Sequence, residues 1–312
     1  MFVFPQSIRF RDMLKGKLQK MSHSTPITKY SERLYNEDLA PVPSNKRTWR
    51  TYSIFAMWMS DVHSISTLLL NFCDFSRFAP SRKAVWFGNF WGLPDNFTAF
   101  SVVSVLVTAG SISVFGSAIT DPVLIVAKIP NTFVLIVGAL TFAVATIGIN
   151  IVANFVSPAY DLANVAPKYI TFKRGGLIAA LGALVVLPWN IYSNPVAINY
   201  FLGGLAAFLG PLFGIIIVDY YLTRRQQVDL DAMYQAGPES PYWYQGGLNM
   251  RAVVAFVVGA AIAAVLALVP MFGTIAPFSW FIGVAISGVL YWILMRVMPA
   301  HVATLRPELT KS

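Results

Sequence analysis

The chain has 312 residues, of which 56% are hydrophobic and only 12% are charged. A water-soluble domain usually carries about 25% charged residues, so this composition excludes a soluble globular protein. The net charge of +9 would suit a nucleic-acid-binding protein, but the basic residues lie between apolar segments, and the single cysteine, Cys73, excludes a disulfide framework and a cysteine-rich metal site.

Residues 1–50 form a basic segment that we expect on the cytoplasmic side of a membrane. Its first apolar residues precede the basic ones, and Pro5 interrupts them, which is not the order of a secretory signal. Met21 opens a polar stretch that could itself begin the protein. Met1 and Met21 therefore stay open as alternative first residues.

Residues 51–76 form an apolar stretch with basic residues on both of its sides and a polar middle. A single crossing of the membrane would place one basic cluster outside and invert every later segment. We therefore expect this stretch either to enter the membrane from the cytoplasm and return, or to lie at the interface. Two half-helices that meet at mid-depth would place Asp61 and His63 at the break.

Six later segments are long and apolar enough to cross a bilayer, which takes about 20 helical residues. Helix is the expected form, because backbone groups in lipid must be hydrogen-bonded within the segment and no segment alternates as a barrel strand does. Pro188 and Pro211 should kink two of these helices. The expected spans are Phe97 to Ile119, Thr132 to Val156, Gly176 to Tyr192, Ile198 to Leu222, Ala252 to Val269 and Phe278 to Met298.

The basic residues also predict the direction of each span, because lysine and arginine are retained on the cytoplasmic side. If every second connection is cytoplasmic, that side holds 22 of the 23 basic residues, and Lys128 is the exception. Both termini are then cytoplasmic. Four spans occupy residues 97–222, a cytoplasmic loop follows at 223–251, two more spans occupy 252–298, and 299–312 is a cytoplasmic tail.

Several long motifs resemble one family of transporters. The chain contains RLYNEDLAPVP, RTWRTYSIFAMWMSDVHSIS, LLLNFCDFSRFAP, GNFWGLPDNFTAF, NIVANFVSPAYDLANVAPKYI, GPLFGIIIVDYYLTRRQQVDLDAMY and YQGGLNMRAVVAFVVG. These resemble, in order, the cytoplasmic lead and then parts of helices 1, 6, 7, 8, 10 and 11 of the nucleobase:cation symporter family, which includes permeases for cytosine and purines, uracil, thiamine, hydantoins and allantoin.

This resemblance implies an internal truncation. The family has twelve spans, ten of which form two inverted five-helix repeats of the LeuT type around the substrate. Here the first-helix motif stops at Ser66, and the sixth-helix motif starts at Thr67 or Leu68. We therefore expect an all-α polytopic membrane protein with a partial LeuT-type fold that lacks most of the first repeat.

Asn150 and Asn154 lie four residues apart on one face of the second span. The resemblance places Asn154 at the family's substrate-contacting amide, and the alternative is that both amides only link helices. In sodium-coupled relatives the same helix supplies a carbonyl and two hydroxyls to the ion. The matching residues here are Ala145, Gly148 and Ile149, which lack both hydroxyls, so proton coupling is favoured over sodium.

Asp61 and His63 are the candidates for a proton-linked role, because an ionisable group at membrane depth indicates function and histidine titrates near neutrality. The alternative is that the truncation leaves both residues at the surface, where they are merely solvated. No nucleophile motif, histidine-rich metal pattern or phosphate-binding glycine loop occurs in the sequence. We therefore expect neither an enzyme nor a cofactor.

The leading functional hypothesis is uptake of a nucleobase or a related heterocycle, such as uracil, cytosine, allantoin or a hydantoin, across the plasma (inner) membrane by proton or cation symport. The expected partners are this small molecule, its coupling ion and the lipid bilayer, with no nucleic acid. Because half of the transport core is absent, transport should be impaired. The alternative is a non-transporting membrane remnant, or a partner that assembles with another copy as a homo-oligomer.

Overall fold

A computed structural model describes residues 30–61, 65–188, 190 and 194–298, with no side-chain placement for residues 61–68 and 195. This part of the chain is helical and contains no strand. The N-terminal half holds η1 (Ser44–Lys46), α2 (Thr51–Asp61), α3 (Ile65–Ser76), α4 (Arg82–Phe115), α5 (Pro122–Ala127), α6 (Thr132–Ile151), a π-helical turn η3 (Val152–Val156) and α7 (Ser157–Val165). The C-terminal half holds α8 (Phe172–Val186), α10 (Pro195–Ile217), a π-helical turn η4 (Val218–Thr223), α11 (Leu230–Met233), α12 (Met250–Leu268), η5 (Pro270–Phe272), η6 (Ala276–Phe278) and α13 (Ser279–Val297).

Within the described residues, five helices are long and apolar enough to cross a membrane, which confirms the expected all-α polytopic membrane protein. They are Arg82–Phe115, Thr132–Val165, Val196–Thr223, Met250–Leu268 and Ala276–Val297. The first of them begins well before the expected Phe97, because the Ser81 side chain accepts a hydrogen bond from Ala84 N and caps the helix there.

The remaining expected span, Gly176 to Tyr192, differs from the structure. Helix α8 has 15 residues and ends at Val186, so it is about 22 Å long and shorter than a hydrocarbon core of about 30 Å. Leu187 adopts a left-handed conformation with φ of 52°. Pro188 explains this end, because a proline disfavours helical backbone in the residue before it. By contrast, α10 continues as a helix through Pro211.

Helices α2 and α3 fold back on each other. The rings of Trp58 and Phe72 stack with centroids 6.0 Å apart, whereas residues this far apart in one straight helix would be separated by about 21 Å. At the open end of the pair, Trp49 N donates to Phe78 O at 3.0 Å. The two helices therefore form a hairpin whose entry and exit lie side by side.

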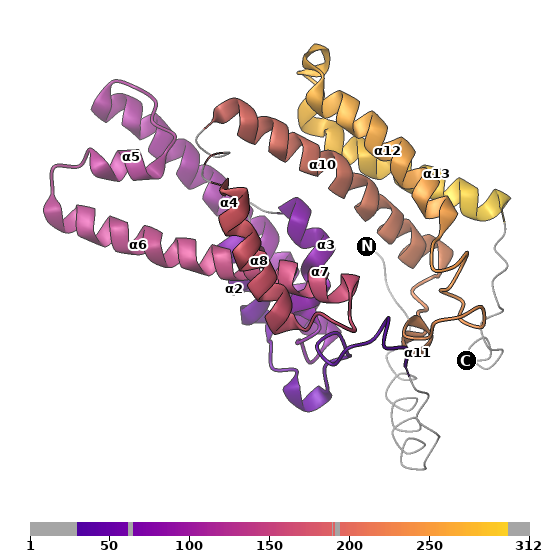
Figure 1. The fold of residues 1–312 in the computed structure, drawn as a ribbon. Helices are drawn as coiled ribbons and strands as arrows, with labels where there is room; N and C mark the ends of the chain where they lie inside the picture. The colour runs from indigo at the N-terminus through magenta and orange to yellow at the C-terminus, as the bar shows by residue number, and fades with distance from the viewer. Residues whose placement is uncertain (1–29, 62–64, 189, 191–193, 299–312) are drawn as a thin grey trace.

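Small residues let the other helices approach closely. A Cβ atom added to Gly88 of α4 would lie 2.6 Å from Ile54 Cβ of α2, and one added to Gly92 would lie 2.8 Å from Trp58 Cδ1. Helices α10, α12 and α13 pack as a second group (Figure 1), in which the backbone of α13 lies against Gly210 and Gly214 of α10. This close contact is typical of membrane helices, whose backbones approach at glycine.

Candidate substrate and coupling site

Asn150 and Asn154 form a short chain of amides on α6 and the π-helical turn η3. Asn154 Nδ2 donates to Asn150 Oδ1 at 2.7 Å, and Asn150 Nδ2 donates to Thr146 O at 2.8 Å. Both residues are exposed. Each amide offers one acceptor oxygen and two N–H groups, so these bonds leave Asn154 with its oxygen and one N–H for a further partner. The hydrogen bonds to Thr146 and Asn150 therefore fix the orientation of the two amides, and the Asn154 amide can bind a further partner.

The π-helical turn marks this part of the helix as unusual. An α-helix that widens to π geometry for one turn does so frequently at a functional site. Val152 and Val156 of this turn pack on the hydrophobic cluster around Ile54 and Trp58 of α2. The π-helical turn that carries Asn154 thus packs against the α2–α3 hairpin.

The structure places Gly148, one of the three expected cation-site residues, close to the tip of that hairpin. A Cβ atom added to Gly148 would lie 3.6 Å from Ser60 Oγ, near the end of α2. Ala145 is exposed on the same helix, and Ile149 is partly buried. A hydroxyl thus lies near Gly148, but it comes from α2 and not from α6.

Asp61 is the last residue of α2, and its side chain lies outside the described atoms. His63 lies outside the described residues. The hairpin therefore puts the backbone of Asp61 at the tip, as the broken-helix interpretation expects, while the proton-linked role of both residues stays a prediction.

A second polar region lies where residues 30–47, here named the lead segment, contact the rest of the chain. Arg77 Nη2 donates to the carbonyls of Asp38 and Ala40 at 2.7 and 3.1 Å. Asn36 Nδ2 donates to Pro167 O at 3.3 Å and Ile170 O at 3.0 Å, and Phe172 N donates to Asp38 Oδ2 at 2.8 Å. The lead segment thereby joins the end of α3 to the loop between α7 and α8.

The lead segment also reaches α11. Tyr30 Oη donates to Asp231 Oδ1 at 2.6 Å, and Tyr234 Oη donates to Leu39 O at 3.2 Å. Arg82, which follows the hairpin, donates to Gln226 at 3.3 Å. The connections that charge alone assigns to one side of the membrane are therefore in contact, and we name this side of the molecule the lead end.

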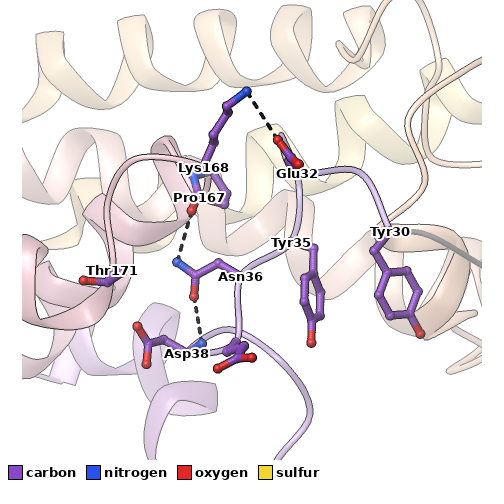
Figure 2. Close-up of a pocket in the computed structure, with 9 residues that line it drawn as sticks. Tyr30, Glu32, Tyr35, Asn36, Asp38, Pro167, Lys168 and Thr171 are labelled. Atoms are coloured by element: carbon purple, nitrogen blue, oxygen red, sulfur yellow. Dashed lines mark hydrogen bonds and ion pairs between the residues drawn. The ribbon is translucent and has the colours of Figure 1, made fainter. Parts of the chain in front are cut away.

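An open cavity of about 550 Å³ lies at the lead end. Figure 2 shows Asn36 between the carbonyl of Pro167 and the backbone of Asp38, with Lys168 and Glu32 paired above it at 3.3 Å. The cavity is lined by the lead segment and the α7–α8 loop, and neither Asn150 nor Asn154 lines it. It is therefore separate from the candidate substrate site.

Two pairs of charged residues lie near helix ends, and only one of the two forms an ion pair in the described part of the chain. Asp219 and Arg224 form an ion pair at 2.6 Å, and Tyr291 Oη of α13 donates to the other oxygen of Asp219 at 2.8 Å. Asp74 and Arg77 form no ion pair within the described residues. The role of Arg77 as a clamp on the lead segment could not be read from the sequence, because its acceptors are backbone carbonyls, which every residue has.

Comparison with known proteins identifies what the chain is similar to. Residues 64–293 match the family described as permeases for cytosine and purines, uracil, thiamine and allantoin. The chain is 40% identical to an allantoin permease of Bacillus subtilis over 266 residues, which cover 84% of this chain and 54% of that protein. It is 34% identical to a purine-uracil permease of Arabidopsis thaliana over 74% of this chain and 40% of the relative.

A uracil permease of Saccharomyces cerevisiae is 30% identical over 65% of this chain and 34% of the relative. No solved structure matches the chain significantly. The chain spans about half the length of the bacterial relative and less of the two eukaryotic ones.

Proposed function

Because this integral membrane chain belongs to the family of permeases for cytosine and purines, uracil, thiamine and allantoin, we propose that it serves the uptake of a nucleobase or a related heterocycle, with uracil, cytosine, allantoin and hydantoins as candidates. The uptake is coupled to a proton or another cation and takes place across the plasma (inner) membrane. The cytoplasmic side is the lead end, where both termini belong.

The observation that carries this proposal is the amide chain from Thr146 through Asn150 to Asn154. Uracil, cytosine, allantoin and hydantoins each present a carbonyl beside an N–H, and a primary amide matches that edge with one donor and one acceptor. The hydrogen bond to Asn150 holds Asn154 in place before the substrate arrives. Fixing a binding group in advance lowers the entropic cost of binding.

A proton is the favoured coupling ion. A sodium site needs several oxygen ligands, and the residues at the corresponding positions, Gly148 and Ile149, have no side-chain oxygen. The hydroxyl of Ser60 lies near Gly148, but one hydroxyl is too few ligands for a sodium ion.

The missing half limits what the chain does alone. In a LeuT-type fold the substrate is enclosed between both repeats, and this chain matches about half of its bacterial relative. Asn150 and Asn154 are exposed in this chain. We therefore propose that the chain by itself does not concentrate substrate. The other candidate, a membrane remnant with no link to transport, is less favoured, because the named relatives are permeases.

Uptake in a bacterial strain without its own nucleobase and allantoin permeases tests the proposal. The unmodified chain should accumulate no more labelled allantoin, uracil, cytosine or hydantoin than an empty vector. A chimera that receives the missing helices of the Bacillus subtilis allantoin permease between Ser66 and Thr67 should accumulate at least one of them. A chimera that reaches the membrane and transports none of the four contradicts the proposed function.

The Asn154→Ala variant of the chimera tests the site itself. Two lost hydrogen bonds, at about 0.5–1.5 kcal/mol each, predict a rise in KM of roughly tenfold. Asn164→Ala is the matched control, because Asn164 is also exposed and lies on α7, just beyond the π-helical turn. Equal effects of the two substitutions on KM would contradict the proposal that Asn154 binds the substrate.

A further inference from the structure

Two carboxyl groups from different helices approach each other at the lead end. Asp74 lies in the last turn of α3, and Asp161 lies on α7. Asn71 Nδ2, one turn before Asp74, donates to Asp161 Oδ2 at 3.1 Å. This bond links α3 to α7 and holds the Asp161 carboxylate beside the α3 face that carries Asp74.

Asp74 is buried, with 9% of its surface exposed, and it has weak partners. The described hydrogen bond to its carboxyl comes from Cys73 Sγ at 3.9 Å, and a thiol is a poor donor. The amide that could have served it, Asn71, is bound to Asp161. An ionised carboxylate in such a place costs free energy unless a cation or strong donors compensate its charge.

Arg77 is the neighbouring cation, but its guanidinium binds other groups and forms no described ion pair with Asp74. Its Nη2 atom donates to the carbonyls of Asp38 and Ala40, its Nε atom is buried without a partner, and its guanidinium lies 5.2 Å from the ring centre of Tyr160. It therefore moderates the charge of Asp74 at a distance without forming an ion pair.

The other elements that pack on α3 supply no further positive charge to compensate an ionised Asp74 carboxylate. Helix α10 has no acidic or basic residue between Pro195 and Ile217. Helix α2 carries Tyr52, which is 75% exposed, and Asp61, whose side chain is not described. On the lead segment, Asp38 adds a negative charge whose Oδ2 atom accepts from Phe172 N.

We propose that Asp74, with Asp161 facing it, is a proton-binding site at the lead end of the molecule. The proton resides on the Asp74 carboxyl, and Asp161 is the charged neighbour that makes its release costly. Burial first, and then the charge of Asp161, raise the pKa of Asp74 to about 7, against the opposing effect of Arg77. The site thus exchanges its proton within the physiological range.

This inference deepens the proposed function, since it names a residue for the coupling proton and rests on that function for its biological meaning. When Asp74 is protonated and neutral, Arg77 donates its hydrogen bonds to the two carbonyls of the lead segment without competition from Asp74. Without the proton, the negative charge of Asp74 competes with those carbonyls for the guanidinium of Arg77. Occupancy of the site is thereby linked to how firmly the lead segment is held.

Infrared spectroscopy of the purified chain in detergent, with isotope-labelled aspartate, tests the site without any transport assay. The C=O band of a protonated aspartic acid should disappear with a midpoint at about pH 7. The component with this midpoint should be absent in Asp74→Asn, and its midpoint should move to lower pH in Asp161→Asn. Asp121→Asn, which keeps an N-capping side chain at an exposed position, should leave the midpoint unchanged.

The result that overturns the proposal is a wild-type protein with no aspartic acid band above pH 5, or a band near pH 7 that persists in Asp74→Asn. Far-ultraviolet circular dichroism of each variant verifies its fold. If Asp74→Asn does not fold, the direction of the Asp161→Asn shift decides alone. An inactive chimera with a normal titration would contradict the proposed function and leave the proton site in place.

Discussion

Trp58 of α2 stacks on Phe72 of α3, with ring planes 15° apart, and the Trp58 Nε1 atom donates to Asn89 Oδ1 of α4 at 2.7 Å. A single side chain therefore closes the hairpin and attaches it to the first long apolar helix. Each half of the hairpin, about 17 Å long, would reach about halfway into a bilayer. This is the geometry expected of a re-entrant segment, and its place in the membrane is our proposal.

Replacement of Trp58 by alanine should destabilise the protein strongly. Trp58 is 1% exposed, and a truncated buried tryptophan costs about 3–5 kcal/mol. Trp86→Ala is the control, because Trp86 is 57% exposed. Thermal unfolding in detergent should show a large drop in the midpoint for Trp58→Ala and a small one for Trp86→Ala. Similar midpoints would mean that the hairpin does not depend on this stack.

A methyl group at Gly88 should separate α2 from α4. The new Cβ atom would lie 2.6 Å from Ile54 Cβ, and such overpacking typically costs about 1–3 kcal/mol. Gly110→Ala is the matched control in the same helix, because a Cβ atom there meets nothing within 4 Å. Denaturant unfolding monitored by tryptophan fluorescence should distinguish the two variants, and an equal response would argue against close packing at Gly88.

Removal of the Tyr291 hydroxyl should loosen the group formed by α10, α12 and α13. This hydroxyl donates to Asp219 at 2.8 Å and accepts from Asn249 at 3.1 Å, so Tyr291→Phe leaves two polar groups with one bond fewer. The expected loss of stability is about 1–3 kcal/mol. Tyr221→Phe, at a residue that is 52% exposed, should cost almost nothing. The free energies of unfolding of the two variants test this difference.

Substitution of Arg77 by glutamine should release the lead segment. Two hydrogen bonds from a charged donor are lost, and a loss of about 2 kcal/mol predicts local opening that is at least tenfold more frequent. Limited trypsin digestion should then cleave after Arg33 or Lys46 correspondingly faster. Arg82→Gln, which removes one exposed contact with Gln226, is the control and should digest like the wild type.

Stability should also depend on pH through Asp74. Its pKa, about 7 in the folded protein, lies above the ordinary value of 3.8, so the folded chain binds more protons than the unfolded chain between these limits. Stability contributed by this proton is complete below about pH 4 and is lost as the pH rises to 7. Asp74→Asn should therefore lose less stability than the wild type between pH 5 and pH 8. Parallel unfolding curves for the two proteins across this range would contradict the prediction.

Much of the architecture was predictable from local pattern. Apolar length identified the long helices. The positions of the basic residues predicted that the stretch from Thr51 to Ser76 returns to its starting side of the membrane; the structure shows that its two helices fold back on each other, and the side of the membrane stays a prediction. The shorter α8 could have been foreseen as well, since Pro188 disfavours helical backbone at Leu187. The early start of α4 could not, because its first turns carry charged and polar residues and a proline, which lower the hydropathy of that stretch.

The amino-acid sequence by itself determined that this chain is an integral membrane protein and which family it belongs to, because apolar length and motif order are properties of the linear chain. The side of the membrane on which each connection lies stays a prediction from the charge distribution. Only the tertiary structure decided which polar groups meet. Asp74 and Asp161 are brought together, and Arg77 finds the carbonyls of the lead segment, through packing between helices distant in sequence. Whether a buried charge is compensated depends on that packing, and composition contains no information about it.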